Sequence, residues 1–366
     1  MMFGKVLNYI KRKKKIINSF DGKTEYMSAG TYVLDDSLKY FTRNDKGTKD
    51  SANKILQTDY YSFLQRLVVM LMRKTLFRKK VTIREQNIQI AGFSGTVFRP
   101  VRGTNGYNDS RIFDLEHKKV LSIFTEENEF QSVIENYEYF NQYFPMPKIL
   151  WADNKGLQIM EELVSFQPYN SWSEEDYLYV LDEIFDRYFE YLSMCCHDPM
   201  TSNKTAINVY QSLSKNNEIQ FLMDKINPAF FKINIPYRKL HGDLWTSNIL
   251  FAKGEKNPIK FIDWEHSKEF MFFYDIFNFM WLEYYVHNNL IYLDKYFSGE
   301  YDDPFERIFS LFKLPFAETC RMDYLNIFLL NFFEKRLVYL DEIDRKGYIN
   351  KYKRLLEEYE SSYAVV

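Results

Sequence analysis

Two carboxylates and one carboxamide, about two thirds of the way along the chain, have the types and spacing needed for phosphoryl transfer. Asp243 and Asn248 lie in the stretch His241-Gly-Asp-Leu-Trp-Thr-Ser-Asn, and Asp263 follows fifteen residues after Asn248. Transfer of a phosphoryl group to a hydroxyl needs a carboxylate beside the attacking oxygen and oxygen ligands for Mg²⁺. We therefore predict that Asp243 is the catalytic group and that Asn248 and Asp263 are metal ligands.

The sequence around these side chains favours this interpretation over a chance match. A short apolar strand is predicted directly after the loop, and a second predicted strand ends at Asp263. In the alternative interpretation, Asp243 and Asn248 are ordinary caps of a surface turn, because short motifs also arise by chance. We expect His241 to brace the loop rather than to ionise.

The loop resembles that of the aminoglycoside phosphotransferase/choline kinase-like family. Gly242 stands where protein kinases have arginine, and Asp263-Trp-Glu stands where they have Asp-Phe-Gly. The sequence His-Gly-Asp-Leu-Trp is also similar to the loop of fructosamine kinases. The resemblance extends over residues 87–281 and implies ATP and Mg²⁺ as cofactors and a small molecule with a hydroxyl group as acceptor. It further implies that Asp275 supports the catalytic loop.

The resemblance also implies a fold, namely the two-lobed protein-kinase-like α+β fold with a small β-rich N-lobe and a large helical C-lobe. We predict a basic N-terminal extension over residues 1–80, the N-lobe over 81–163 and the C-lobe over 164–366. Hydrophobic periodicity predicts several long helices. They cover residues 60–77, 126–140, 176–194, 270–285 and 324–340.

Nucleotide contacts are expected in the N-lobe. Gly92-Phe-Ser94-Gly95 is predicted as a tight turn between two strands, and its backbone N–H groups can approach phosphate oxygens. An ordinary hairpin turn is the alternative. The resemblance implies that backbone groups from Glu161 to Leu163 hydrogen-bond adenine at the hinge.

The chain departs from the family at the position of the phosphate-binding lysine. Our alignment places Ser122 there, on a strand predicted over 119–124. Either Lys118-Lys119 supplies the cation in a shifted register, or Arg111 on the neighbouring strand replaces it. Glu135 or Glu138, on the following helix, is expected to pair with that cation, although a solvated helix face is the alternative.

Composition and charge narrow the remaining possibilities. Hydrophobic residues make up 46% of the 366 residues and aromatic residues 18%, which is ample for a packed core. Three cysteines form no disulfide framework and suit a reducing cytoplasm. Residues 1–80 hold 18 Lys and Arg against 7 Asp and Glu, a net charge of +11, whereas the remainder carries −13. This asymmetry suggests that the first part binds an anionic membrane surface or a polyanionic partner, with no nucleic acid expected.

The acceptor is less closely defined than the reaction. A hydroxyl of a sugar or amino-sugar is the first choice, and a choline-like alcohol is the second. A nucleotide-binding pseudokinase that acts as an interaction module is the alternative from another class, and Ser122 is its only support. A protein kinase is the weakest alternative, because the Ala-Pro-Glu and activation-loop signature is missing after Asp263.

Overall fold

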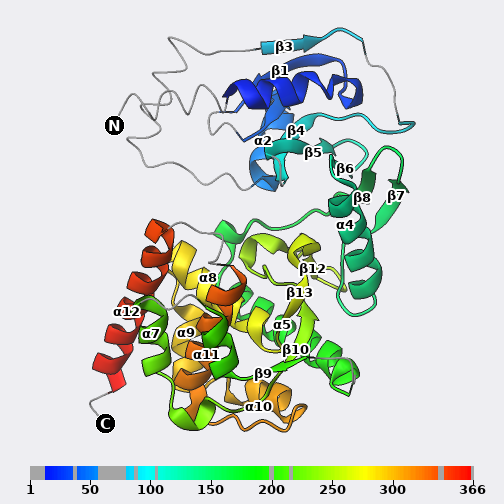
Figure 1. Cartoon of the computed structure of the whole chain (residues 1–366). Coiled ribbons are helices and arrows are strands. Elements are labelled where there is room, and N and C mark those ends of the chain that lie inside the picture. The colour runs from blue at the N-terminus through cyan, green and yellow to red at the C-terminus, as the bar shows by residue number, and fades with distance from the viewer. Residues whose placement is uncertain are drawn as a thin grey trace. The chain divides into compact units, whose positions relative to one another are not determined.

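The computed structural model describes residues 13–35, 39–56, 80–85, 90–103, 106–197, 202–213, 217–336 and 342–363 (Figure 1). The chain divides into a sheet-rich unit and a helical unit. The sheet-rich unit comprises Met1–Tyr139, Pro145–Ser171 and Leu250–Lys260, and the helical unit comprises Phe140–Phe144, Trp172–Ile249 and Phe261–Val366. The predicted α+β organisation into a β-rich part and a helical part is thereby confirmed.

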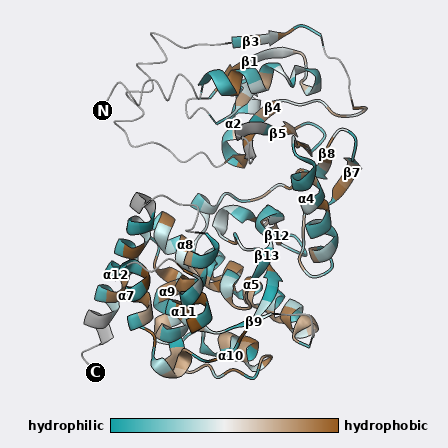
Figure 2. Ribbon diagram, viewed as in Figure 1, coloured by the Kyte–Doolittle hydropathy of each residue, from teal (hydrophilic) through white to brown (hydrophobic). Residues whose placement is uncertain are grey.

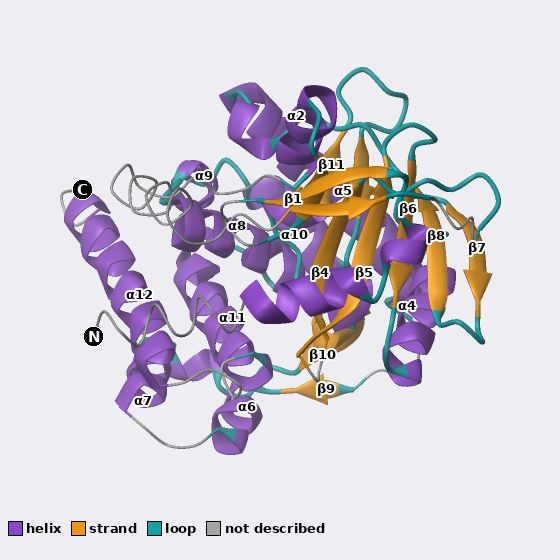
Figure 3. Cartoon of the chain, turned by 90° about the horizontal axis from the view of Figure 1, so that it is seen from above, coloured by secondary structure: helices purple, strands orange, loops and turns teal. Residues whose placement is uncertain are grey.

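The sheet-rich unit is built on one eight-stranded sheet. Its strands, in spatial order, are β3 (Lys80–Ile83), β1 (Gly30–Leu34), β2 (Phe41–Arg43), β4 (Val97–Gly103), β5 (Gly106–Asp114), β6 (Lys119–Ile123), β8 (Gln158–Glu162) and β7 (Ile149–Asp153). Figure 3 shows β4, β5, β6, β8 and β7 side by side. The sequence predicts residues 1–80 as an extension apart from the N-lobe, whereas β1, β2 and β3 are strands of this sheet.

The register of the sheet assigns its side chains to two faces, because residues that pair across strands point to the same side. On the first face Ile112 pairs with Leu121, which pairs with Met160, and the helix formed by residues 13–21 packs there through Phe20. On the second face Arg111 pairs with Ser122. We call these the first and second faces below.

A short helix covers the apolar part of the second face. Val97 and Val120 lie on that face by register, and they pack with Ala52 and Ile55 of α2 (Lys46–Ile55). Leu163 belongs to the same hydrophobic cluster. The side chain of Asp45 caps α2 by accepting the N–H of Thr48 at 2.8 Å.

The remaining elements belong mainly to the helical unit. The sheet-rich unit also contains most of α4 (Glu127–Phe140). The helices of the helical unit are α5 (Glu174–Cys195), α6 (Ala206–Ser212), α7 (Asn217–Asp224), α8 (Tyr274–His287), α9 (Ile291–Ser298), α10 (Asp302–Ser310), α11 (Arg321–Lys335) and α12 (Glu342–Tyr363). Its strands β9 (Asn203–Lys204), β10 (Ile235–Leu240) and β13 (Lys268–Met271) form a small sheet. The strands β11 (Ile249–Phe251) and β12 (Ile259–Phe261) pair with each other and belong mostly to the sheet-rich unit.

Helix α8 forms the centre of the helical unit. Every residue from Tyr274 to Tyr284 is buried, including the polar Asp275, Asn278 and Glu283. A helix that is apolar on all sides is a core helix, so its buried polar groups need partners within the protein. Aromatic rings of the neighbouring helices surround it, and Figure 2 shows the hydrophobic residues of α9 and α11 in brown.

One predicted helix differs from the structure. The stretch predicted as one helix over 270–285 is divided into β13 and α8, which is a helix only from Tyr274 onward. The helix predicted over 60–77 lies outside the described residues. No helix in the described part of the chain is long and apolar enough to cross a membrane.

Candidate active site

The predicted catalytic loop leaves the end of β10 and lies against the N-terminal turn of α8. The Asp275 carboxylate accepts the backbone N–H of His241 at 2.7 Å and that of Gly242 at 2.8 Å. It also accepts the Tyr188 hydroxyl at 2.6 Å. Burial raises the pKa of Asp275, and the hydrogen bonds from its neighbours act in the opposite direction. Asp275, which was predicted to support the loop, therefore binds the first two loop residues, His241 and Gly242, directly.

Two further polar side chains of α8 hold the rest of the loop. Asn278 donates to the Leu244 carbonyl at 2.8 Å, and Thr246 donates its hydroxyl hydrogen to the Glu283 carboxylate. Asn278, Thr246 and Glu283 are all buried. The sequence analysis missed both anchors on α8, because an isolated Asn or Glu in an aromatic helix gives no sign of what it contacts.

His241 is fully buried, and its hydrogen bonds define one neutral tautomer. The ring Nε2 lies 2.8 Å from the carbonyl oxygen of Ile262, which only accepts, so Nε2 carries the hydrogen. Nδ1 then accepts the backbone N–H of Asp243 at 3.2 Å. The imidazole thus links the residue before Asp263 to Asp243, which is the bracing geometry that the sequence analysis expects.

Gly242 is required where the loop passes under an aromatic ring. Its φ angle is +77°, and a Cβ atom there would lie 2.4 Å from a ring carbon of Phe270. A left-handed backbone costs a non-glycine residue about 1–2 kcal/mol. Displacing a packed ring costs about 1–3 kcal/mol more.

We expect Gly242→Ala to lower the free energy of unfolding by about 2–5 kcal/mol, the sum of the strain and the clash. Gly254→Ala is the matched control, because Gly254 has φ +91° with no atom within 4 Å of its would-be Cβ. Denaturant unfolding of both variants separates the cost of the left-handed backbone from the cost of the clash with the Phe270 ring. Equal losses at the two glycines would show that the Phe270 contact does not constrain the loop.

The two predicted metal ligands come from neighbouring strand ends. The N–H of Ile262, just before Asp263, donates to the Asn248 carbonyl at 3.1 Å. The Asn248 side chain donates to the Asp243 carbonyl at 2.7 Å, and its amide oxygen accepts no hydrogen bond from the described residues. An amide oxygen and a carboxylate are ligands of the kind that Mg²⁺ takes, so these residues fit such an ion.

Asp263 has an uncommon backbone conformation. Its φ and ψ angles are 63° and 53°, a left-handed conformation that few non-glycine residues adopt. The next residue, Trp264, is buried and stacks on Phe140 with ring centroids 4.1 Å apart. This packing holds the turn and fixes where the carboxylate emerges. Strained backbone held by its surroundings is characteristic of functional sites.

Arg336 is a site residue that the sequence analysis missed. Its Nε and Nη2 donate to the Gly242 carbonyl at 3.1 and 2.6 Å, and Nη2 also pairs with the Asp243 carboxylate. Arg336 directly follows α11, far from the loop in sequence. Only the packing of α11 brings it there, so no local pattern could have predicted it.

The predicted phosphate turn uses its own backbone donors within the protein. The N–H of Ser94 donates to the Asp114 carboxylate at 2.6 Å. The N–H groups of Phe93 and Gly95 donate to the carbonyls of Ile90 and Tyr26 at 3.2 and 3.0 Å. Three of the N–H groups that we expected the turn to offer to phosphate, those of Phe93, Ser94 and Gly95, thus donate within the protein.

The other expected nucleotide residues are spread over the sheet-rich unit. The N–H groups of Glu162 and Leu163 donate to the carbonyls of Lys148 and Lys118 at 3.0 and 2.8 Å, so they are engaged rather than open to adenine. Glu161 is an interior position of β8 and pairs with Val120. The N–H groups of Glu162 and Leu163 are therefore not available for the adenine contacts expected at this segment.

Two candidates for the phosphate-binding cation lie on opposite faces of the sheet. Arg111 pairs with Ser122 and so lies on the second face beside the substituted position. Lys119 lies on the first face and donates to the Gly92 carbonyl at 2.7 Å. Glu135 and Glu138 are both exposed, and neither contacts a cation among the described residues, contrary to the expected ion pair.

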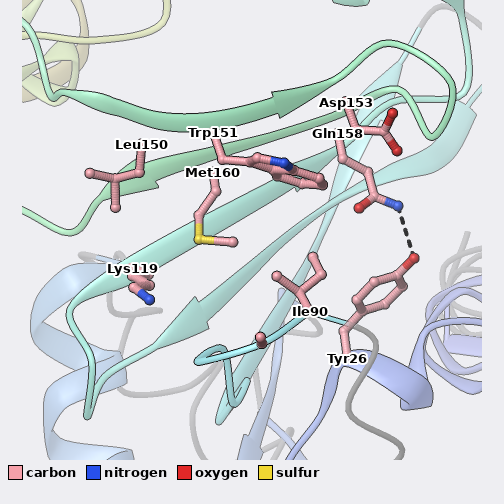
Figure 4. A pocket seen from close by; sticks show the side chains of 9 residues that line it. Tyr26, Ile90, Lys119, Leu150, Trp151, Asp153, Gln158 and Met160 are labelled. Atoms are coloured by element: carbon pink, nitrogen blue, oxygen red, sulfur yellow. Dashed lines mark hydrogen bonds between the residues drawn. The ribbon is translucent and has the colours of Figure 1, made fainter.

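A cavity of about 740 Å³ lies on the first face of the sheet. Trp151, Met160 and Gln158 line one side of it, and Tyr26 lies opposite with its hydroxyl 2.9 Å from the Gln158 amide nitrogen (Figure 4). Lys119 also lines the cavity. Because it is on the face opposite Ser122 and Arg111, it does not correspond to the expected nucleotide site.

The structure resembles solved structures of small-molecule kinases. Choline kinase LicA from Streptococcus pneumoniae aligns with 81% of this chain and 98% of its own at 13% identity and a TM-score of 0.41. Aminoglycoside phosphotransferase APH(3'')-Id from Streptomyces rimosus aligns with 74% and 99% at 11% identity and a TM-score of 0.38. Amicoumacin kinase hAmiN, solved with AMP-PNP, Ca²⁺ and Ami, aligns with 68% and 85% at 12% identity and a TM-score of 0.39.

Comparisons of the sequence found neither a matching family model nor a matching curated protein. The structural likenesses have low identities and TM-scores below 0.5. The functional argument therefore depends on the residues of the loop itself.

Proposed function

We propose that this protein is an ATP-dependent phosphotransferase that moves the γ-phosphoryl group to a hydroxyl of a small molecule, and that it uses Mg²⁺. The arrangement of Asp243 carries the proposal. Its loop is fixed by the buried Asp275 and by the neutral His241, and the side chain of Asn248 reaches back to its carbonyl. These contacts fix the Asp243 carboxylate in one place, and a fixed carboxylate can position the attacking hydroxyl of the acceptor.

Each residue has a separate role in this proposal. Asp243 orients the acceptor hydroxyl and accepts its proton. Asn248 and Asp263 would hold Mg²⁺, which neutralises charge on the phosphates when it is bound. Arg336 holds the Gly242 carbonyl and one oxygen of Asp243, and so acts as a positioning residue. His241 keeps a single neutral tautomer and does not exchange protons with the acceptor.

A hydroxyl of a sugar or amino-sugar is the acceptor class that we propose first, with a choline-like alcohol second. The test is a measurement of phosphate transfer from labelled ATP to a panel of small alcohols, sugars and aminoglycosides. Mg²⁺-dependent transfer to at least one alcohol supports the proposal. If the protein binds MgATP but transfers phosphate to no acceptor, the pseudokinase alternative is favoured.

We expect Arg111→Ala to weaken ATP binding by about tenfold or more, since hydrogen bonds to charged groups contribute about 1.5–3 kcal/mol. Arg111 lies beside Ser122 on the second face, whereas Lys119 lies on the first. Lys119→Ala is therefore the matched control and should change ATP affinity less. Equilibrium binding of a fluorescent ATP analogue measures both variants. A loss centred on Lys119 would place the phosphate contact on the first face and contradict this assignment.

A further inference from the structure

Four cationic side chains lie near one another in the helical unit, and one of them contacts Asp243. They are Lys204, Lys268, Lys335 and Arg336, and we call them the basic cluster. Arg336 contacts the loop directly through the Gly242 carbonyl and the Asp243 carboxylate. Lys335 is its neighbour in sequence and the last residue of α11.

Contacts through the backbone and through aromatic rings connect the members of the cluster, and Lys268 reaches the loop through a ring. The Lys268 ammonium donates to the Lys335 carbonyl at 3.3 Å and lies 5.5 Å from the centre of the Phe270 ring. That ring is the one that packs against Gly242. Lys204 and Lys335 share the Tyr237 ring, with their ammonium groups 5.1 and 5.6 Å from its centre.

Carboxylates compensate only part of this positive charge. Glu334 pairs with Lys204 at 2.8 Å and lies 4.0 Å from Lys335. Lys268 has no carboxylate within ion-pair distance among the described residues, and Glu269 is exposed and accepts the Ser202 hydroxyl at 2.8 Å.

The pKa values of two of these lysines are lowered, and neighbouring cations contribute to both shifts. The pKa of Lys268 is lowered by burial and then by the nearby charges of Lys335 and Arg336. The pKa of Lys335 is lowered mainly by burial, whereas the nearby charges of Glu334 and Glu269 raise it and that of Lys204 lowers it. An anion bound between these lysines would relieve both the burial and the repulsion.

This environment is unsuited to a cationic acceptor. A choline-like or amino-sugar molecule would bring its positive charge towards Lys268, which has no carboxylate within ion-pair distance among the described residues, and towards Lys335, and like charges at short range disfavour binding. A molecule that carries an anionic group beside its hydroxyl would instead gain charge-assisted hydrogen bonds from the lysines.

We propose that the acceptor is an anionic alcohol, whose phosphate or carboxylate group binds Lys268 and Lys335 while its hydroxyl faces Asp243. The proposal rests on the phosphotransferase function proposed above and narrows its acceptor class. The same group is found on free sugar phosphates and on the headgroups of anionic lipids, and the test separates these two sources.

The first experiment compares matched acceptors in labelled-ATP transfer assays. The pairs are glycerol with glycerol 3-phosphate, and glucose with glucose 6-phosphate and glucuronate. Choline and an aminoglycoside are the cationic members, and vesicles of phosphatidylglycerol or phosphatidylcholine test lipid headgroups. The anionic member of at least one pair should have a kcat/KM about tenfold or more above its neutral partner, and added salt should reduce this advantage.

The outcomes of this assay are distinct. Transfer to phosphatidylglycerol vesicles without transfer to free phosphates identifies the lipid source. A preference for choline or for the aminoglycoside overturns the anionic acceptor and leaves the phosphotransferase function intact. No transfer to any acceptor counts against the proposed function, and the second experiment then still decides whether the cluster binds an anion.

The second experiment measures binding of glycerol 3-phosphate without ATP, by calorimetry. Lys268→Met and Lys335→Met should each weaken binding about tenfold, since each removes one charge-assisted contact. Lys295→Met is the matched control and should bind as the wild type does, because Lys295 pairs with Glu300 at the end of α9. Unchanged binding in both Lys268→Met and Lys335→Met, or no binding to the wild type, overturns the proposal.

Discussion

Asp243→Asn should lower kcat by about 10²–10⁴-fold, the range that general-base assistance typically contributes. Asparagine keeps the size of the side chain and can still face Arg336, but it cannot accept the proton of the acceptor hydroxyl. Because Asp243 is assigned to the acceptor and not to the metal, the KM for MgATP should change little. Steady-state kinetics with the preferred acceptor measures both constants.

The control for this prediction is Asp303→Asn, which changes an exposed carboxylate in the first turn of α10. It should leave kcat unchanged. If Asp243→Asn retains turnover within about threefold of the wild type, Asp243 is not the group that accepts the proton, since even weak general-base assistance exceeds that factor.

Asp275→Ala should destabilise the fold by at least about 3 kcal/mol, because each buried donor left unsatisfied costs about 1–3 kcal/mol. Three donors lose their acceptor at once, namely the N–H groups of His241 and Gly242 and the Tyr188 hydroxyl. The midpoint of urea unfolding measures the loss.

Two further variants make this stability prediction specific. Tyr188→Phe removes only one of the three hydrogen bonds and should cost about 1 kcal/mol, the usual net contribution of a single bond. Asp303→Ala removes an exposed carboxylate and should be close to neutral. A loss of less than about 1 kcal/mol in Asp275→Ala would mean that the loop does not depend on this carboxylate.

The loop could be predicted from the sequence because its residues are close together in the chain. Short spacings and predicted strands relate Asp243, Asn248 and Asp263 in the sequence. In the structure, a backbone hydrogen bond joins Ile262, the residue before Asp263, to Asn248, and the Asn248 side chain donates to the Asp243 carbonyl. The role of His241 followed from the same local pattern. The predicted mixed architecture followed from the family resemblance, and the helical spacing of apolar residues after residue 173 agrees with it.

The missed features depend on tertiary packing. Arg336 and Glu283 reach the loop from α11 and α8, and neither lies in a recognisable motif. The turn at Gly92 has the composition of a phosphate-binding turn, yet Asp114 accepts the N–H of Ser94 from twenty residues away. The sequence of α2 is mostly polar, so it did not predict that Ala52 packs on the second face of the sheet. A local pattern shows which donors exist, but only the fold shows which acceptors they have.

Calorimetry of ATP binding with and without Mg²⁺ tests the central claim most directly, when it is applied to the wild type, Asp243→Asn and Asp263→Asn. Asp243→Asn should bind MgATP as the wild type does. Asp263→Asn should lose the Mg²⁺-dependent part of the affinity, because an amide replaces a negative ligand of a hard cation. Equal losses of nucleotide affinity in the two variants, or none in either, would contradict the assignment of Asp243 to the acceptor and Asp263 to the metal.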